Sequence, residues 1–115
     1  MSNAWRRHKR EVTKEKYLAY CGGKRCRLCG ISHLPIYCYD FHHIYDKDFN
    51  ISWAINKGLP VEAIKDELDK CVVLCSNCHR EVHHNPVRRR ELMEIVGEAG
   101  HGDNVIRQQH ILHLP

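Results

Sequence analysis

The chain has 115 residues, of which 43% are hydrophobic and 28% charged, and its formal net charge is +4. This length fits one domain, with a core too small to rely on burial alone. No apolar run approaches the roughly 20 residues that cross a bilayer, and charges stand where a signal peptide has its apolar segment. We therefore expect a cytoplasmic protein that does not enter membranes.

The basic residues are concentrated at the N-terminus. Residues 1–30 carry nine Lys and Arg against two acidic residues, whereas residues 31–70 carry four against seven. A basic arm ahead of a neutral-to-acidic body suggests a polyanionic partner whose phosphates the arm contacts. The candidate contacts are Arg6, Arg7, Lys9 and Arg10. A solvated helix face is the open alternative.

The first half of the chain has three predicted elements. Residues 5–20 contain no Gly or Pro and predict a helix with a thin apolar stripe, formed by Trp5, Val12 and Ala19. Residues 26–30 predict a tight turn with a thiol at each end. The β-branched and aromatic run 36–44 predicts a strand, followed by a polar loop.

The second half alternates helices and a strand. A predicted helix at 52–57 ends at Gly58, and a second begins near Pro60. A predicted strand follows at 71–75. The next predicted helix is capped by Ser76 or Asn77 and ends at Asn85-Pro86, and a last helix at 87–96 ends at Gly97. This order predicts a small α+β fold. We divide it into a basic N-terminal helix at 1–22, a core at 23–86, and a C-terminal helix and tail at 87–115.

Two thiol pairs share one spacing. Cys26-x-x-Cys29 and Cys75-x-x-Cys78 each place two sulfurs on one turn, and two such turns complete a tetrahedral zinc site. The odd count of seven cysteines, without a signal peptide, argues against a disulfide framework. A closed four-thiolate site is structural, although a redox pair in one CxxC and buried free thiols are alternatives.

The other three thiols lack this spacing. Of these, we expect Cys38 and Cys71 to be small buried strand residues.

Four of the ten histidines stand out. His42 and His43 are adjacent at the end of the first predicted strand. His79 and His83 lie four residues apart on the helix after Cys78, so both rings leave one helix face and can bind one divalent ion. We expect the other histidines to face solvent: His8, His33, His84, His101, His110 and His113.

The segments CSNCHREVH (75–83) and FHHI (41–44) together resemble the HNH endonucleases, specifically the zinc-stapled kind of bacteria and phages. The resemblance runs from about Cys26 to His84, roughly half of the chain. It implies a ββα-metal nuclease core stapled by a four-cysteine zinc knuckle, with the N-terminal basic helix and extra helices around it.

The resemblance also implies roles for the histidines. His43 corresponds to the general base, and His42, His79 and His83 to ligands of one catalytic divalent cation (Mg²⁺, Mn²⁺, Ni²⁺, Co²⁺ or Zn²⁺). Arg80 is a candidate contact to a phosphate oxygen. Many members carry Asn at the start of the second strand, where this chain has Lys70-Cys71, so the resemblance leaves open what orients His43.

The function expected from this resemblance is hydrolysis of phosphodiester bonds in DNA, with double-stranded DNA as the first candidate. Two alternatives belong to other classes. A catalytically inactive zinc knuckle that only binds nucleic acid needs neither the HH pair nor the helical His pair. A thiol–disulfide protein would use one CxxC, but the chain lacks the βαβ context of such motifs.

Overall fold

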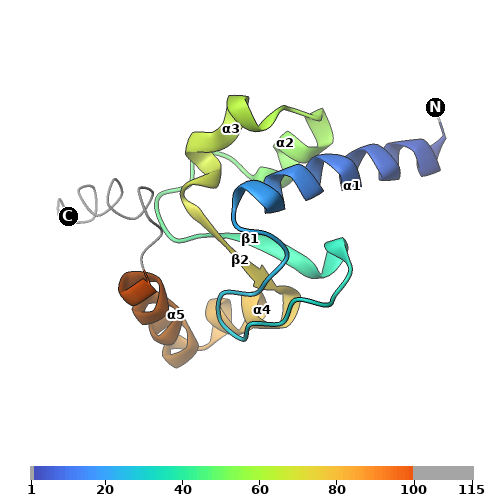
Figure 1. Ribbon diagram of the computed structural model, residues 1–115. Coiled ribbons are helices and arrows are strands. Elements are labelled where there is room, and N and C mark those ends of the chain that lie inside the picture. Colours follow the sequence, from blue (N-terminus) through green and yellow to red (C-terminus); the bar gives the residue numbers. More distant parts are fainter. Residues whose placement is uncertain (1, 100–115) are drawn as a thin grey trace.

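The computed structural model describes residues 2–99 (Figure 1). The chain has a small mixed α+β fold, which confirms the predicted class. Its elements are α1 (Asn3–Tyr20), a 3₁₀ turn η1 (Ile36–Cys38), β1 (Tyr39–His43), α2 (Ile51–Lys57), α3 (Val61–Leu68), β2 (Cys71–Cys75), α4 (Ser76–His84) and α5 (Pro86–Ala99).

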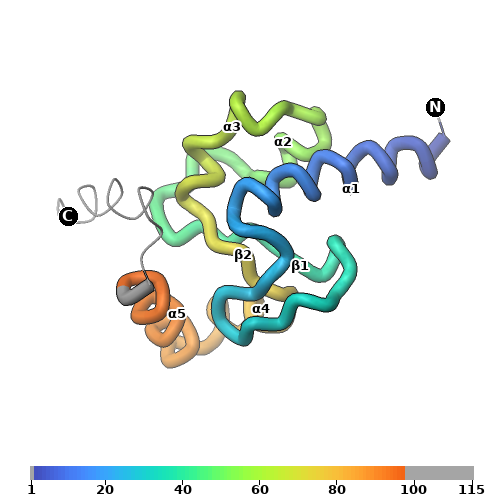
Figure 2. Tube along the Cα trace, viewed as in Figure 1, coloured from blue at the N-terminus to red at the C-terminus, as the bar shows by residue number. Residues whose placement is uncertain are grey.

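The centre of the fold is an antiparallel pair of strands, β1 and β2, with Tyr39 opposite Cys75 and His43 opposite Cys71. Helices cover both faces of this pair: α1, α2 and α3 lie on one side, and α4 and α5 on the other (Figure 1, Figure 2). Every residue of β2 is therefore buried. Val72 packs in the cluster with α4 and α5, whereas Val73 packs toward α1, because successive side chains point to opposite faces.

Helix α1 packs with its C-terminal half only. Its buried residues are Thr13, Tyr17 and Leu18, so the predicted stripe of Trp5, Val12 and Ala19 is wrong, and all three are exposed. The described residues before Thr13 are all exposed, and the N-terminal end of α1 projects past the body of the protein (Figure 2).

Two tyrosine hydroxyl groups join the packed half of α1 to the segments before and after α3. Tyr17 donates to the Leu59 carbonyl at 2.7 Å, and Tyr20 donates to the Asp69 carboxylate at 2.7 Å.

The predicted strand at 36–44 is shorter than expected. Its first three residues form η1, since Pro35 precedes them with a fixed φ and the Cys38 N–H closes a turn onto the Pro35 carbonyl at 3.0 Å. Cys38 is therefore a half-buried turn residue and not the buried strand residue that we expected.

Two helix boundaries also differ. The cap of α4 is Cys75 and neither Ser76 nor Asn77, because its sulfur accepts the Cys78 N–H. Helix α5 runs through Gly97 to Ala99, since that glycine keeps a negative φ and does not form the expected stop.

Among residues 2–99, no helix is both long and apolar enough to cross a membrane. The expectations for His101, His110 and His113 lie outside the described residues.

Candidate metal centre and catalytic site

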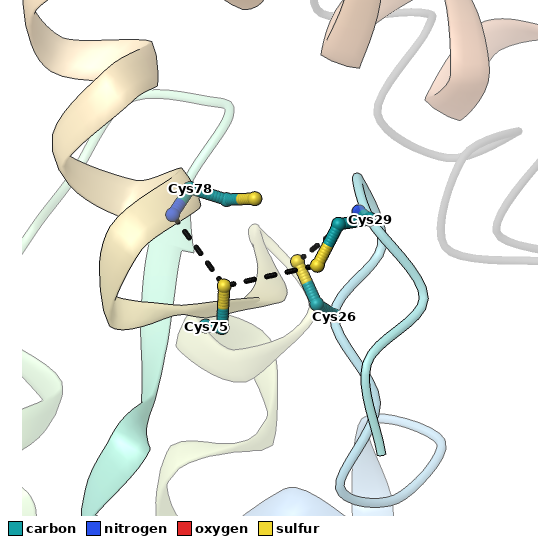
Figure 3. A group of neighbouring side chains, drawn as sticks. All are labelled: Cys26, Cys29, Cys75 and Cys78. Atoms are coloured by element: carbon teal, nitrogen blue, oxygen red, sulfur yellow. Dashed lines mark hydrogen bonds between the residues drawn. The ribbon is translucent and has the colours of Figure 1, made fainter. Parts of the chain in front are cut away.

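The four paired cysteines converge in the structure and form one thiol cluster (Figure 3). Cys26 and Cys29 come from the turn after α1, Cys75 ends β2, and Cys78 lies in the first turn of α4. Their sulfur atoms all lie within 4.8 Å of one another, and those of Cys29 and Cys75 are 3.8 Å apart. Sulfurs about 2.3 Å from one tetrahedral zinc ion lie about 3.8 Å apart, so the cluster fits zinc.

Backbone hydrogen bonds hold the thiol cluster in place. The Cys29 and Cys78 N–H groups donate to the sulfurs of Cys26 and Cys75, and the Arg27 N–H donates to the Val73 carbonyl of β2 at 2.9 Å. Burial raises the pKa of Cys26, but hydrogen bonds from backbone N–H groups outweigh burial and lower that pKa to about 7. Cys26 thus favours the thiolate, the form that binds metal, whereas burial raises the pKa of Cys29 and of Cys78.

The remaining thiols lie outside this cluster. Burial raises the pKa of Cys21 to about 12 and raises the pKa of Cys71 as well, so both stay protonated and unreactive. Cys71 is a buried residue of β2, as the sequence predicts.

A second group, the histidine cluster, joins the end of β1 to α4. His42 comes from β1, and His79 and His83 lie one turn apart on α4; one ring nitrogen of each lies within 4.8 Å of the others. The Nε2 atoms of His79 and His83 are 3.1 Å apart. Nitrogens about 2.0–2.1 Å from a shared ion are about 2.8–3.0 Å apart in an octahedral site and about 3.3–3.4 Å apart in a tetrahedral one, so a separation between these values is compatible with one divalent cation.

Asp40 orients one histidine of this cluster. Its carboxylate lies 3.0 Å from His79 Nδ1, and this hydrogen bond lowers the pKa of Asp40. An ionised carboxylate only accepts, so Nδ1 carries the proton and the Nε2 lone pair faces the cluster. Asp40 was not among the site residues predicted from the sequence, although its position two residues before His42 on a strand places both side chains on one face.

His42 is neutral at physiological pH. Burial, together with the positive charge that the neighbouring histidines can carry, lowers its pKa to about 4. Burial lowers the pKa of His83 too. Neutral imidazole is the form that binds a metal ion, so the lowered pKa values of His42 and His83 favour metal binding.

His43 points to the opposite face of β1 and meets α3. Its Nε2 atom lies 2.8 Å from a carboxylate oxygen of Glu67, whose side chain is only 3% exposed. The same oxygen accepts the Asp48 N–H at 2.9 Å, and the other accepts the Lys70 ammonium at 3.0 Å. Glu67 therefore fixes the His43 ring and the loop after β1 together.

Glu67 orients the His43 ring, and it was not among the site residues predicted from the sequence. The available signal was its place between Ile64 and Leu68, on the flank of the apolar face of α3. An acidic residue in that position is buried only when other groups donate hydrogen bonds to its carboxylate. Lys70 is one of these donors.

One cavity of about 470 Å³ joins the histidine cluster to His43. Its lining residues are Lys14, Asp40, Phe41, His42, His43, Lys47, Asn50, Ile51, Ser52, Ile55, His79 and His83. Arg80 is exposed and does not line this cavity. The four candidate nucleic-acid contacts of α1 lie on the exposed N-terminal part of that helix: Arg6, Arg7, Lys9 and Arg10. His8, His33 and His84 are exposed, as predicted.

Neither a protein-family model, nor a curated protein, nor a solved structure matches the chain.

The thiol cluster makes a prediction about stability. Purified protein should hold about one zinc ion per chain, and Cys75→Ser should cost several kcal/mol or abolish folding, because binding of a structural metal contributes folding free energy. Zinc content by mass spectrometry and thermal unfolding measure this. Cys38→Ser, outside the cluster, is the matched control and should keep both. A metal-free protein that unfolds cooperatively at the same temperature would contradict the assignment.

The histidine cluster predicts a second, weaker metal site. Titration of Mn²⁺, Co²⁺ or Ni²⁺ into zinc-loaded protein by calorimetry should show one added site, which His42→Ala, His79→Ala or His83→Ala weakens most. Asp40→Asn should weaken it by roughly 10- to 100-fold, as loss of a carboxylate behind a metal-binding histidine does. His84→Ala on the same helix is the control. Unchanged affinity in His83→Ala would show that the ion is not held there.

Proposed function

We propose that the chain is a metal-dependent endonuclease of the HNH type that hydrolyses phosphodiester bonds in DNA. In this proposal His42, His79 and His83 hold one divalent ion, His43 is the general base, and the thiol cluster is a structural zinc site. The observation that carries the proposal is the joint lining of one cavity by three convergent histidines and a fourth that a buried carboxylate orients.

Three protein ligands favour a catalytic over a structural ion. The thiol cluster offers four ligands and fills a tetrahedral sphere, whereas the histidine cluster offers three and leaves positions open toward the cavity. A divalent ion bound there supplies charge stabilisation to the phosphate under attack. A zinc module that only binds nucleic acid needs no such second cluster, which makes that alternative less favoured.

His43 has the hydrogen bonding of a general base. Hydrogen bonds from Lys70 and from the Asp48 backbone lower the pKa of Glu67 although burial raises it, so its carboxylate is ionised and accepts the His43 Nε2–H. The Nδ1 lone pair is then free to take a proton from the attacking water. The negative charge of Glu67 stabilises the imidazolium that results, because the two groups remain 2.8 Å apart.

The roles of His43 and Glu67 predict separable defects. His43→Ala should lower the rate of plasmid cleavage by roughly 10²–10⁴-fold while metal affinity and DNA binding stay the same, because only proton transfer is lost. Glu67→Gln should lower the rate by roughly 10- to 100-fold, since the His43 ring keeps a partner but loses its charge. Single-turnover cleavage over a range of metal concentrations measures both.

Exposed His33 provides the control, and His33→Ala should cleave at the original rate. The assignment is falsified if His43→Ala loses metal affinity while His42→Ala retains it, since the neighbours would then exchange roles. If the metal-loaded protein binds DNA but does not cleave the plasmid, the alternative of a zinc knuckle that only binds nucleic acid would be favoured.

A further inference from the structure

A basic groove leads away from the histidine cavity along α1. A second hollow of about 400 Å³ shares Lys14, Ser52 and Ile55 with the histidine cavity. The second hollow therefore adjoins the histidine cavity; it is bordered by α1, η1 and α2 and is here called the α1 groove.

The α1 groove has the charge of a phosphate-binding track. Arg7, Arg10 and Lys14 line it at helical spacing, and Glu11 is its acidic residue. From Lys14 to Arg7 the helix rises about 10 Å, the length of roughly three nucleotides at the stacked spacing of about 3.4 Å.

An exposed aromatic ring lies in the same groove. Tyr37 of η1 is 74% exposed and lines the hollow that Arg7 and Arg10 also line. In a duplex the base faces are covered by their neighbours, and only edges and phosphates are available. An unpaired base exposes its face and stacks on an aromatic side chain, so a ring beside a row of cations is typical of single-strand binding.

We propose that the α1 groove binds an unpaired strand of the nucleic acid next to the bond that is cut, with a base stacked on Tyr37 and phosphates on Arg7, Arg10 and Lys14. This inference rests on the proposed nuclease function and names its substrate class, which is DNA with a single-stranded segment adjoining the scissile phosphate. Lys14 joins the two parts of the site, because it lines the histidine cavity and the groove.

The test measures binding without cleavage. Zinc-loaded His43→Ala protein is titrated into a fluorescein-labelled DNA strand of about 12 nucleotides, and separately into the same strand as a duplex, with anisotropy as the readout. Tyr37→Ala in this background should weaken single-strand binding by roughly 5- to 150-fold and leave duplex binding unchanged, whereas Tyr37→Phe should bind as before. Trp53→Ala is the control, since Trp53 is also 50% exposed but does not line the groove.

The cations of the groove give a second readout. Arg7→Ala and Arg10→Ala should each lower the salt slope of single-strand binding by about 0.7, because one fewer counterion-releasing contact remains. Equal loss of duplex and single-strand binding in Tyr37→Ala, or no loss in either, would overturn the stacking assignment. Cleavage by the original chain is scored separately on a duplex that carries a single-stranded segment: cleavage without a Tyr37 effect overturns only the groove, and a Tyr37 effect without cleavage overturns only the nuclease.

Discussion

The position of Cys75 determines where the candidate site forms. This residue ends β2, caps α4 with its sulfur, and belongs to the thiol cluster with Cys26 and Cys29 of the distant turn. A metal ion bound by the cluster would therefore fix the start of α4 relative to the sheet. Because His79 follows Cys78 directly and His83 lies one turn later, a fixed start of α4 would hold both rings opposite His42.

The alternation of side chains along β1 separates two chemical roles. Asp40 and His42 face α4, where they meet His79, while His43 faces α3 and meets Glu67. Neighbouring histidines thus enter different electrostatic surroundings. Burial among other histidines keeps His42 neutral, with its pKa lowered to about 4, and a buried carboxylate holds the ring of His43. Both still reach one cavity because β1 ends at His43 and the chain turns away there.

The flanking helices contribute to the site as well as to the core. Helix α3 carries Glu67, which is buried because His43, Lys70 and the Asp48 backbone satisfy its oxygens. Helix α1 packs through Tyr17 and Leu18 and leaves its basic N-terminal part exposed along α2. The packed half of α1 therefore anchors a charged half, which extends the candidate site beyond the histidine cavity.

The sequence alone determined the α+β class, most element positions and the pairing of the two CxxC turns, because strand alternation, helix-breaking residues and thiol spacing are local signals. It also singled out the four histidines that line the cavity. Only the tertiary structure decided what orients them: Glu67 lies 24 residues from His43, and Asp40 lies 39 residues from His79. It also decided that the heptad-spaced stripe of α1 is exposed, and that Tyr37 lines a groove with Arg7 and Arg10. Such contacts depend on how separate elements pack, and no periodicity within one element specifies the packing of another.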